Sequence, residues 1–395
     1  MSILVGIIGK PNVGKSTYFS ALTENQVEIA NYPFTTIASN RGVAYIRAKC
    51  PDAELGKRCN PRFGKCINST RMVPVEIIDV AGLVPGAHEG KGLGNKFLDD
   101  LRRADGFIQV VDATGSLDRN GNPVNSGTFD PLEDAEFVHR EIVMWLSQII
   151  SDGLDRGLRK LESEGGKLEN VIYERISGLG IDIKDLSIAI KNTPIPSDLR
   201  KWDDVVTEAL AEEILRISKP GIIVASKGDL ISEGDAKKLE ERGATVVSGD
   251  YELVLKRAAK AGFIDYVPGG RSFTVLRDES LTANQREALR KVSLYLQSRG
   301  GTKVQESLEF LVHDVLKQIV VYPVEDENHW TDKNGNVLPD AILMKRGSTA
   351  LDLAYKVHTD LGERFIRAVN GRTKRTLGRD YVLEDGDVIK IVASR

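Results

Sequence analysis

Long apolar runs, an excess of charge of one sign and paired-cysteine metal patterns are all missing from this sequence of 395 residues. No stretch approaches the roughly twenty apolar residues that cross a bilayer, and the N-terminus lacks a basic lead and a small-residue cleavage site. The net charge of −3 gives no overall attraction to nucleic acid, so any such partner must meet a local basic patch. We therefore expect a cytoplasmic protein, whose length and 41% hydrophobic residues suffice for about two to four domains.

The three cysteines, Cys50, Cys59 and Cys66, lie in one loop-like stretch rich in Asn, Pro, Gly and basic residues. Their spacing matches no CxxC zinc pattern, and no histidine lies near them in the sequence. Ordinary reduced thiols are therefore the expected state. A metal site is a weaker alternative, and an intracellular disulfide is another if the source is a hyperthermophile.

What the sequence does contain is a complete phosphate-binding P-loop pattern, GxxxxGK[ST], at residues 9–16. It follows the apolar run 3–8, which predicts a first strand, and a helix is expected to begin near Lys15. The two glycines allow a tight turn that points backbone N–H groups at phosphate oxygens, Lys15 would reach the β and γ phosphates, and the Ser16 hydroxyl would coordinate Mg²⁺. The residues expected to bind nucleotide here are Gly9, Pro11, Asn12, Val13, Gly14, Lys15, Ser16 and Thr17.

The motifs after the P-loop follow the order of a Ras-like GTPase. The segment NYPFTT occupies the place of switch I, where a threonine senses Mg²⁺ and the γ-phosphate; we favour Thr36 over Thr35, although spacing alone cannot choose. The strand expected at 73–80 leads into a DxxG motif, in which Asp79 would reach Mg²⁺ through water and the Gly82 N–H would meet the γ-phosphate. The predicted metal ligands are Ser16, Thr36 and Asp79.

The residue after the DxxG motif is Leu83, where Ras-like hydrolases place a glutamine that orients the attacking water. A leucine side chain can neither donate nor accept a hydrogen bond, so the water must be positioned otherwise. The glycine-rich segment 85–94 is expected to be a mobile switch II, with His88 and Glu89 as its polar candidates. His88 could orient the water as a neutral imidazole, or it could be a merely solvated loop residue. The predicted catalytic residues are His88, Thr36 and Lys15.

Base recognition is expected after a buried strand predicted at 220–225, where SKGD stands in the place of the usual NKxD. Asp229 can accept both N1–H and N2–H₂ of guanine, a donor pair that adenine lacks, while the stem of Lys227 can lie over the base plane. Ser226 is shorter than the usual asparagine, so its bracing contacts are expected to be weaker. This pattern favours GTP over ATP.

A weaker signal for the base lies after a strand predicted at 244–247. There the backbone N–H groups of Ser248 and Gly249 could meet the guanine oxygen. The signal is too short to stand without the preceding motifs.

The motifs GKPNVGKST, NYPFTT and DVAGLVPGAHEGKGLGNKFL, with LMKRGSTALDLAYKVHTDLG near the C-terminus, resemble those of the Obg-related GTPases, specifically the YchF-like branch with a TGS domain. The resemblance covers essentially the whole chain. It implies an α/β fold: a P-loop (Ras-like) G domain with an inserted helical domain and a C-terminal β-grasp TGS domain. It also implies slow hydrolysis and ribosome association, and it supports Thr36 and a hydrophobic Leu83. Several YchF members have a degraded base motif and prefer ATP, whereas this chain keeps Lys227 and Asp229, so ATP is the rival to GTP.

Related GTPases with asparagine at the position of Asn12 can use it to bind K⁺ beside the phosphates, where the cation supplies part of the charge that an arginine finger gives. An asparagine that only braces the turn is an equally good interpretation. The expected cofactors are therefore GTP or GDP and Mg²⁺, with K⁺ as an addition.

The pattern of elements divides the chain into four segments. After the strand expected at 107–111, about a hundred residues that a minimal G domain does not need carry apolar side chains at helical spacing, with Trp145 and Trp202 as expected core residues. The predicted segments are the first part of the G domain (1–113), a helical insertion (114–215), the completion of the G domain with following helices (216–320) and the TGS domain (321–395).

The last segment predicts a small β-grasp fold, with strands at 319–324, 341–344 and 387–392 around a helix at 349–359. A helical region is predicted before it, at 281–316.

Within this segment a basic stretch contains no acidic residue and could neutralise RNA phosphates, with Phe365 available to stack on a base. A solvated surface is the alternative. The cations are Arg364, Arg367, Arg372, Lys374, Arg375 and Arg379.

Two functional classes follow. In the first, a GTPase cycle drives a switch, and the insertion and TGS domain report its state to a ribosome or RNA. In the second, an RNA-binding or ribosome-binding module holds nucleotide as a structural ligand; Leu83 is the argument for it, while the intact P-loop, switch I and DxxG favour the first. No membrane partner is expected, and a monomer is favoured over an obligate oligomer.

Overall fold

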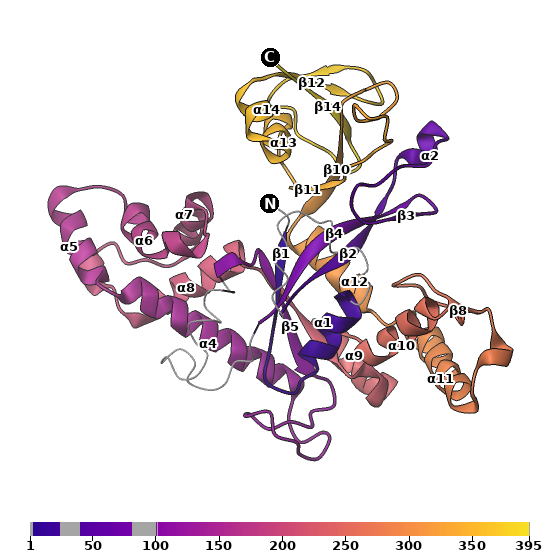
Figure 1. The fold of residues 1–395 in the computed structure, drawn as a ribbon. Coiled ribbons are helices and arrows are strands. Elements are labelled where there is room, and N and C mark those ends of the chain that lie inside the picture. Colours follow the sequence, from indigo (N-terminus) through magenta and orange to yellow (C-terminus); the bar gives the residue numbers. More distant parts are fainter. Residues whose placement is uncertain (1–2, 24–39, 81–99, 101, 395) are drawn as a thin grey trace. The chain divides into compact units, whose positions relative to one another are not determined.

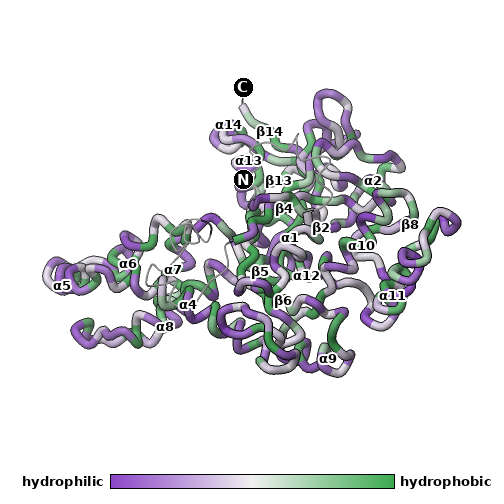
Figure 2. Tube along the Cα trace, turned by 60° about the horizontal axis from the view of Figure 1, so that its bottom comes forward, coloured by the Kyte–Doolittle hydropathy of each residue, from purple (hydrophilic) through white to green (hydrophobic). Residues whose placement is uncertain are grey.

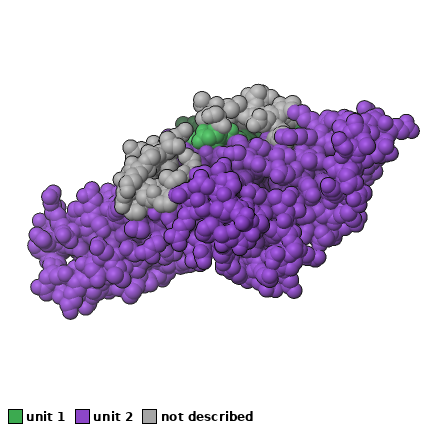
Figure 3. Space-filling view, turned by 90° about the horizontal axis from the view of Figure 1, so that it is seen from below, with its two compact units in different colours: residues 1–3, 25–76, 308–395 green, residues 4–24, 77–307 purple. Residues whose placement is uncertain are grey.

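The chain forms two compact units, which Figure 1 draws as a ribbon and Figure 3 colours separately. Unit 1 comprises residues 1–3, 25–76 and 308–395, and unit 2 comprises residues 4–24 and 77–307. The computed structural model describes residues 3–23, 40–80, 100 and 102–394.

Unit 2 is built on parallel strands. β1 (Leu4–Ile8), β5 (Gly106–Asp112), β6 (Gly221–Ser226) and β7 (Ala244–Val246) pair in that order, each with a parallel register. The residue after β4 (Thr70–Asp79) lies beside β1, because the Val80 N–H donates to the Ile7 carbonyl at 3.0 Å. β1 and most of β5 are buried, as expected for parallel strands with helices on both faces, and the tube near the β5 label in Figure 2 is largely hydrophobic. The five expected strands of this sheet are confirmed.

Five further helices accompany these strands and carry the chain between them. α1 follows β1, α9 and α10 flank β7, and α11 packs its buried Leu289, Val292 and Leu296 into a core with α10. Their bounds are α1 (Lys15–Thr23), α9 (Glu233–Glu241), α10 (Gly249–Lys260), α11 (Ala283–Arg299) and α12 (Val304–Glu309), with the short strands β8 (Ile264–Asp265) and β9 (Thr274–Val275) after α10.

The expected insertion is helical. Aspartate side chains cap three of its helices by accepting backbone N–H bonds: Asp130, Asp182 and Asp203. Trp145 is 8% exposed and Trp202 packs against the same core, which confirms both as core residues. The helices are α4 (Pro131–Ser151), α5 (Leu154–Glu164), α6 (Leu168–Ile176), α7 (Ile183–Asn192) and α8 (Asp204–Ser218).

The helical region expected at 281–316 is interrupted, which corrects its reading as one stretch. α11 ends at Arg299, where Gly300 adopts a left-handed conformation with φ of 68° and donates its N–H to the Leu296 carbonyl. Gly301 follows with φ of 134°. α12 then continues into a π-helical stretch at Phe310–Val315.

Unit 1 contains a five-stranded sheet in the order β11-β10-β14-β12-β13. Its core includes the fully buried Val321, Leu353, Ala368 and Ile389, which come from three strands and one helix. The expected β-grasp strands and helix are present, with two strands in addition. The elements are β10 (Gln318–Val324), β11 (Ile342–Lys345), α13 (Ala350–Val357), α14 (Thr359–Glu363), β12 (Phe365–Asn370), β13 (Thr376–Leu377) and β14 (Val388–Ala393).

The rest of unit 1 comes from the N-terminal part of the chain. β2 (Arg41–Lys49) and β3 (Cys66–Ile67) lie on either side of β4, with the short helix α2 (Asp52–Leu55) between them in sequence. The hairpin from β3 to β4 turns at Asn68 and Ser69, both with positive φ, as a two-residue turn requires.

Across the described ranges, no helix combines the length and the apolar character that crossing a membrane requires.

Candidate functional site

The P-loop joins β1 to α1, and its two fixed glycines are there for steric reasons. Gly9 has φ of 147°, and a Cβ on it would lie 2.4 Å from the Val110 carbonyl oxygen. Gly14 has φ of 94°, and its Cβ would come within 3.1 Å of the Ser226 hydroxyl. Because any side chain at either position would be strained, the loop keeps the close backbone turn that can surround phosphate oxygens.

The three polar groups predicted for phosphate and metal meet at one end of the sheet. The Ser16 hydroxyl donates to Asp79 Oδ2 at 3.2 Å, and Lys15 Nζ donates to the Lys10 carbonyl at 2.5 Å. Hydroxyl and carboxylate oxygens are the hard ligands that Mg²⁺ prefers, so this donor set fits that ion.

Burial sets the charge balance of this site. It lowers the pKa of Lys15 against the opposing attraction of Asp79, and it raises the pKa of Asp79 against the opposing effects of Lys15 and Ser16. Burial removes part of the water around the Lys15 ammonium, so a neighbouring anion would stabilise its charge. A bound phosphate would be such an anion.

The loop that contains Asp118 and Gly121 lies against the P-loop, and no sequence motif connected it to the nucleotide. Lys10 is 1% exposed; its Nζ lies 2.6 Å from Asp134 Oδ2 and donates to the Asp118 carbonyl at 2.7 Å. Asn12, with φ of 63°, donates its side-chain N–H to the Gly121 carbonyl at 3.1 Å. Lys10 occupies a variable position of the motif, so nothing local in the sequence indicates its role. The Asn12 contact is a bracing one, and the K⁺ interpretation stays a prediction.

On the base side, Ser226 contacts the P-loop directly. It is 5% exposed, and its hydroxyl lies within donating distance of the Val13 carbonyl at 2.5 Å and the Val111 carbonyl at 3.0 Å. One hydroxyl proton can serve only one of these acceptors at a time. Ser226 therefore reaches the backbone of the P-loop despite its short side chain, and the expectation that it braces the loop more weakly than asparagine stays a prediction.

The two charged residues of SKGD are each held by a partner. Lys227, with φ of 56°, donates from Nζ to Asp112 Oδ2 at 2.9 Å, and Asp229 Oδ1 accepts from the Ser248 hydroxyl at 2.7 Å. Burial alone would raise the pKa of Asp112, but hydrogen bonds from Lys227, Thr114 and Ser116 hold it below the usual range. The chain thus presents a carboxylate and a lysine stem at the carboxyl end of β6.

Ser248 makes hydrogen bonds other than the expected one to a guanine oxygen. Its backbone N–H donates to the Thr302 carbonyl at 3.0 Å, so it is not available to a guanine oxygen, which corrects that prediction. Its hydroxyl instead fixes Asp229. Gly249 opens α10 and lies close to Thr17 of α1, since a Cβ on Gly249 would be 3.2 Å from Thr17 Cγ2.

Several predicted residues lie outside the described ones, and their roles stay predictions. They belong to switch I and to the segment from DxxG onward: Thr35, Thr36, Gly82, Leu83, His88 and Glu89.

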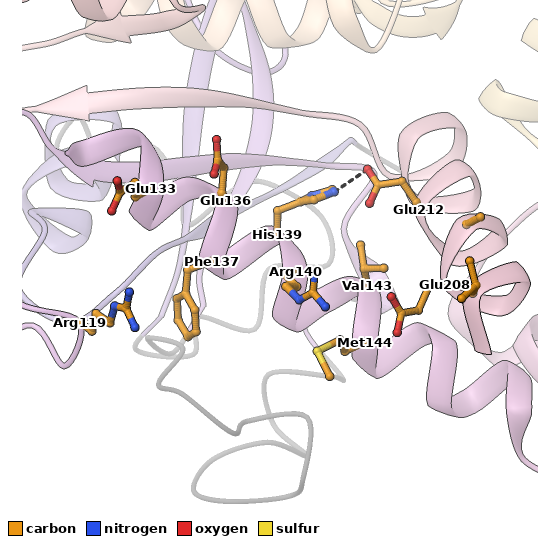
Figure 4. Close-up of a pocket in the computed structure, with 12 residues that line it drawn as sticks. Arg119, Glu133, Glu136, Phe137, His139, Arg140, Val143, Met144, Glu208 and Glu212 are labelled. Atoms are coloured by element: carbon orange, nitrogen blue, oxygen red, sulfur yellow. Dashed lines mark hydrogen bonds and ion pairs between the residues drawn. The ribbon is translucent and has the colours of Figure 1, made fainter. Parts of the chain in front are cut away.

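A groove between α4 and α8 is distinct from these residues (Figure 4). Its lining contains no residue of the P-loop, and it mixes cations with the carboxylates of Glu133, Glu136, Glu208 and Glu212. His139 faces Glu212 across it, with Nε2 2.7 Å from Oε1. Because carboxylates repel phosphate, the groove is not a second candidate for the nucleotide.

The expected basic stretch is only partly available to a ligand. Arg372 forms a bidentate ion pair with Glu54, with its Nε 2.6 Å from Oε2, and Lys374 Nζ donates to the Gly371 and Glu327 carbonyls. Phe365 is half-buried and packs against the core of the five-stranded sheet, and its stacking on a base stays a prediction. In the described part of the chain, no acidic side chain pairs with the four remaining cations: Arg364, Arg367, Arg375 and Arg379.

Comparison with known proteins places the chain. Residues 4–138 match the family described as 50S ribosome-binding GTPase, residues 224–326 the G4 motif-containing domain of YGR210-like Obg-like GTPases, and residues 334–393 the TGS domain. A GTP-binding protein of Methanocaldococcus jannaschii is 48% identical, with 99% of each chain covered. The chain belongs to the YchF-like branch of the Obg-related GTPases. This confirms the expected family and the fold class, and it makes the protein a P-loop nucleoside triphosphatase that binds GTP.

Two other relatives of this YchF-like GTPase extend the comparison. The crystal structure of a GTP-binding protein from Pyrococcus horikoshii OT3 has a TM-score of 0.78 and 40% identity over 100% of both chains. The ribosome-binding ATPase YchF of Mycoplasma genitalium is 29% identical, with 97% of each chain covered. The likeness therefore spans the G domain, the insertion and the TGS domain together.

Proposed function

We propose that this protein hydrolyses GTP slowly to GDP and phosphate as a molecular switch, and that its partner is a ribosome or RNA. The observation that carries the guanine assignment is the Asp229 carboxylate, fixed by the Ser248 hydroxyl at 2.7 Å beside a Lys227 that is anchored on Asp112. A fixed carboxylate can accept two hydrogen bonds from the guanine edge, and adenine has no matching donor pair.

The chemistry at the phosphate end is assigned as follows. Lys15 would hold the β and γ phosphates, and Ser16 and Asp79 would hold Mg²⁺, joined by Thr36. The ion, when bound, would neutralise charge on the phosphates. Leu83 offers no hydrogen bond to an attacking water, which supports slow hydrolysis, and His88 is the side chain proposed to orient that water.

An ATP-preferring hydrolase is the second candidate. It is favoured by relatives whose names are Obg-like ATPase 1 and ribosome-binding ATPase, at 28% and 29% identity. Against it stand Lys227 and Asp229, the two base-reading residues that this chain keeps.

The test exploits the difference between guanine and xanthine. Nucleotide-free protein is titrated calorimetrically with GDP, ADP and xanthosine diphosphate in Mg²⁺ and K⁺. Asp229→Asn should weaken GDP about 100-fold or more, because two bonds to a charged acceptor are lost. It should strengthen xanthosine diphosphate, because the amide N–H₂ can donate to the second carbonyl of xanthine.

The matched control is Asp250→Asn, the same substitution at an exposed position in the first turn of α10. It should leave all three affinities unchanged. Equal binding of GDP and ADP by the unaltered protein, with no effect of Asp229→Asn, would instead identify an ATP-type hydrolase.

The switch itself is tested by multiple turnover. Hydrolysis that ribosomes stimulate would support the enzyme class, whereas negligible hydrolysis with intact RNA binding would favour the module that holds nucleotide as a structural ligand.

A further inference from the structure

A compact group of metal-ligating side chains lies in unit 1, outside the residues assigned to nucleotide. Cys50 follows β2, Asp52 opens α2, Cys59 lies in the next loop and Cys66 begins β3. One ligand atom from each residue lies within 4.8 Å of the other three. The fourth member, Asp52, is not a cysteine, so the spacing of the cysteines could not reveal it. For this reason the sequence alone made a metal site the weaker alternative.

Two of the distances between these ligand atoms match the edges of a tetrahedron around one ion. Cys50 Sγ lies 3.6 Å from Cys59 Sγ, and Cys66 Sγ lies 3.7 Å from Asp52 Oδ2. Around Zn²⁺, with bonds of about 2.3 Å to sulfur and 2.0 Å to oxygen, tetrahedral edges are about 3.8 Å for S···S and 3.5 Å for S···O. A disulfide needs about 2.05 Å between its sulfurs. The observed separations therefore match ligands of a shared cation.

A buried positive charge lies beside the group. Arg71 is 1% exposed; its Nη1 lies 3.6 Å from Cys59 Sγ, and it also donates to the Leu338 and Pro339 carbonyls at 3.0 and 2.8 Å. Among the described residues no carboxylate comes within ion-pairing distance of Arg71, and the Asp340 carboxyl interacts with it only from further away. Three thiolates and a carboxylate around Zn²⁺ carry a net charge of about −2, which would give this guanidinium the counter-charge that burial demands.

The segment has little apolar packing of its own. From residue 51 to residue 71 no large apolar side chain is buried: Leu55 and Phe63 are half-buried and Ile67 is exposed. Loop-rich segments without a core of their own are commonly fixed by a metal or by disulfides.

We propose that Cys50, Asp52, Cys59 and Cys66 bind one structural Zn²⁺. The four side chains complete a tetrahedron and leave no position for water or substrate, which is the mark of a structural site. The ion would fix the loop that contacts residues 337–339 through two 2.8 Å hydrogen bonds, from the Asn60 N–H to Val337 and from the Arg62 N–H to Pro339.

The test uses the full chain and Co²⁺ as a visible substitute for Zn²⁺. Metal-free protein, reduced with a phosphine and saturated with Mg²⁺ and GDP, is titrated with Co²⁺ and then with Zn²⁺. We expect one Co²⁺ per chain, a sulfur-to-cobalt charge-transfer absorption, and its loss on addition of one equivalent of Zn²⁺. Cys59→Ser and Asp52→Asn should each weaken Zn²⁺ binding at least about tenfold.

Glu54→Gln is the matched control, since it makes the same change two residues from Asp52 and breaks the ion pair with Arg372 without touching a ligand. It should bind Zn²⁺ as the unaltered chain does. Unchanged GDP affinity in each variant shows that unit 2 is folded, and unchanged amide NMR signals of residues 318–393 show the same for unit 1, so weak metal binding cannot be ascribed to unfolding.

Three results would overturn the proposal. One is a reduced, unaltered chain that shows no charge-transfer absorption with Co²⁺. Another is equal Zn²⁺ affinity in Cys59→Ser and in the unaltered chain. The third is an equal loss of Zn²⁺ affinity in Glu54→Gln and Asp52→Asn, which would show that the loss comes from a changed surface charge rather than from a lost ligand.

Discussion

At the scale of single residues, Ser226 links the base-reading segment to the phosphate-binding loop. Its hydroxyl reaches the Val13 carbonyl within the P-loop and the Val111 carbonyl at the end of β5. Asparagine would span this gap with a longer side chain, whereas serine does so because Gly14 has no Cβ to keep it away. Serine in place of the usual asparagine is thus compatible with a rigid nucleotide site.

We predict that Ser226→Ala lowers the free energy of unfolding by about 1 to 2 kcal/mol, because buried carbonyls lose a donor. GDP affinity should fall as well, since the P-loop loses its brace. Urea unfolding and calorimetry measure the two effects. Ser163→Ala, which removes an exposed hydroxyl from α5, should change neither; equal losses in both variants would contradict the assigned role.

Local pattern accounts for some of the site residues and not for others. The P-loop, DxxG and SKGD place their side chains by fixed spacing, so the meeting of Ser16 with Asp79 follows from strand order alone. Lys10 was not predicted as a site residue because its partners lie far away in the sequence. Asp52 was not predicted because its partners are cysteines, a different class of residue. Spacing rules describe the residues of one motif and cannot show a partner such as Asp134.

At the scale of elements, the break between α11 and α12 depends on two glycines. Gly300 caps α11 in a left-handed conformation that other residues adopt only with strain. A helical period continues through residues 281–316 in the sequence, and the capping glycine is the feature that ends the first helix.

Gly300→Ala should therefore destabilise the protein by about 1 kcal/mol through backbone strain alone. Thermal or urea unfolding measures this difference. Gly178→Ala is the control, because Gly178 lacks a positive φ and a Cβ on it would meet nothing within 4 Å. If the two variants lose the same stability, the capping role assigned to Gly300 is wrong.

Strand and helix positions were predictable because their periodicity is strong. The strands expected near residues 3–8, 107–111 and 220–225 are present, with bounds that differ by one or two residues. β12 was not predicted because its arginines stood out in the sequence as a charged stretch. A register shift between Phe365 and Arg367 also breaks the alternation of buried and exposed side chains that marks a strand.

At the scale of the whole molecule, a protein with an acidic net charge carries a stretch of exposed arginines near its C-terminus. Arg364, Arg367, Arg375 and Arg379 are exposed, whereas Arg372 and Lys374 serve contacts within unit 1. The proposed RNA contact therefore rests on four cations rather than six.

Changing these four arginines to glutamine should reduce the salt dependence of RNA binding, by up to about 0.7 in the slope of log K against log salt per lost phosphate contact. Binding of a single-stranded RNA oligomer is measured at several KCl concentrations. The control removes four exposed cations of the insertion, at Arg156, Arg159, Lys184 and Lys191. A loss confined to the control variant would place the RNA surface on the insertion instead.

Unit 1 draws its chain from two distant parts of the sequence, and this has a consequence for how a new molecule is made. The segment with Cys50, Asp52, Cys59 and Cys66 leaves the ribosomal tunnel early, yet Arg71 finds its acceptors only at Leu338 and Pro339. All of residues 77–307 must be synthesised in between, and such long-range closure is slow. A nascent chain that stops before residue 338 can complete its parallel sheet around the P-loop while Arg71, beside the three thiols, still lacks its carbonyl acceptors.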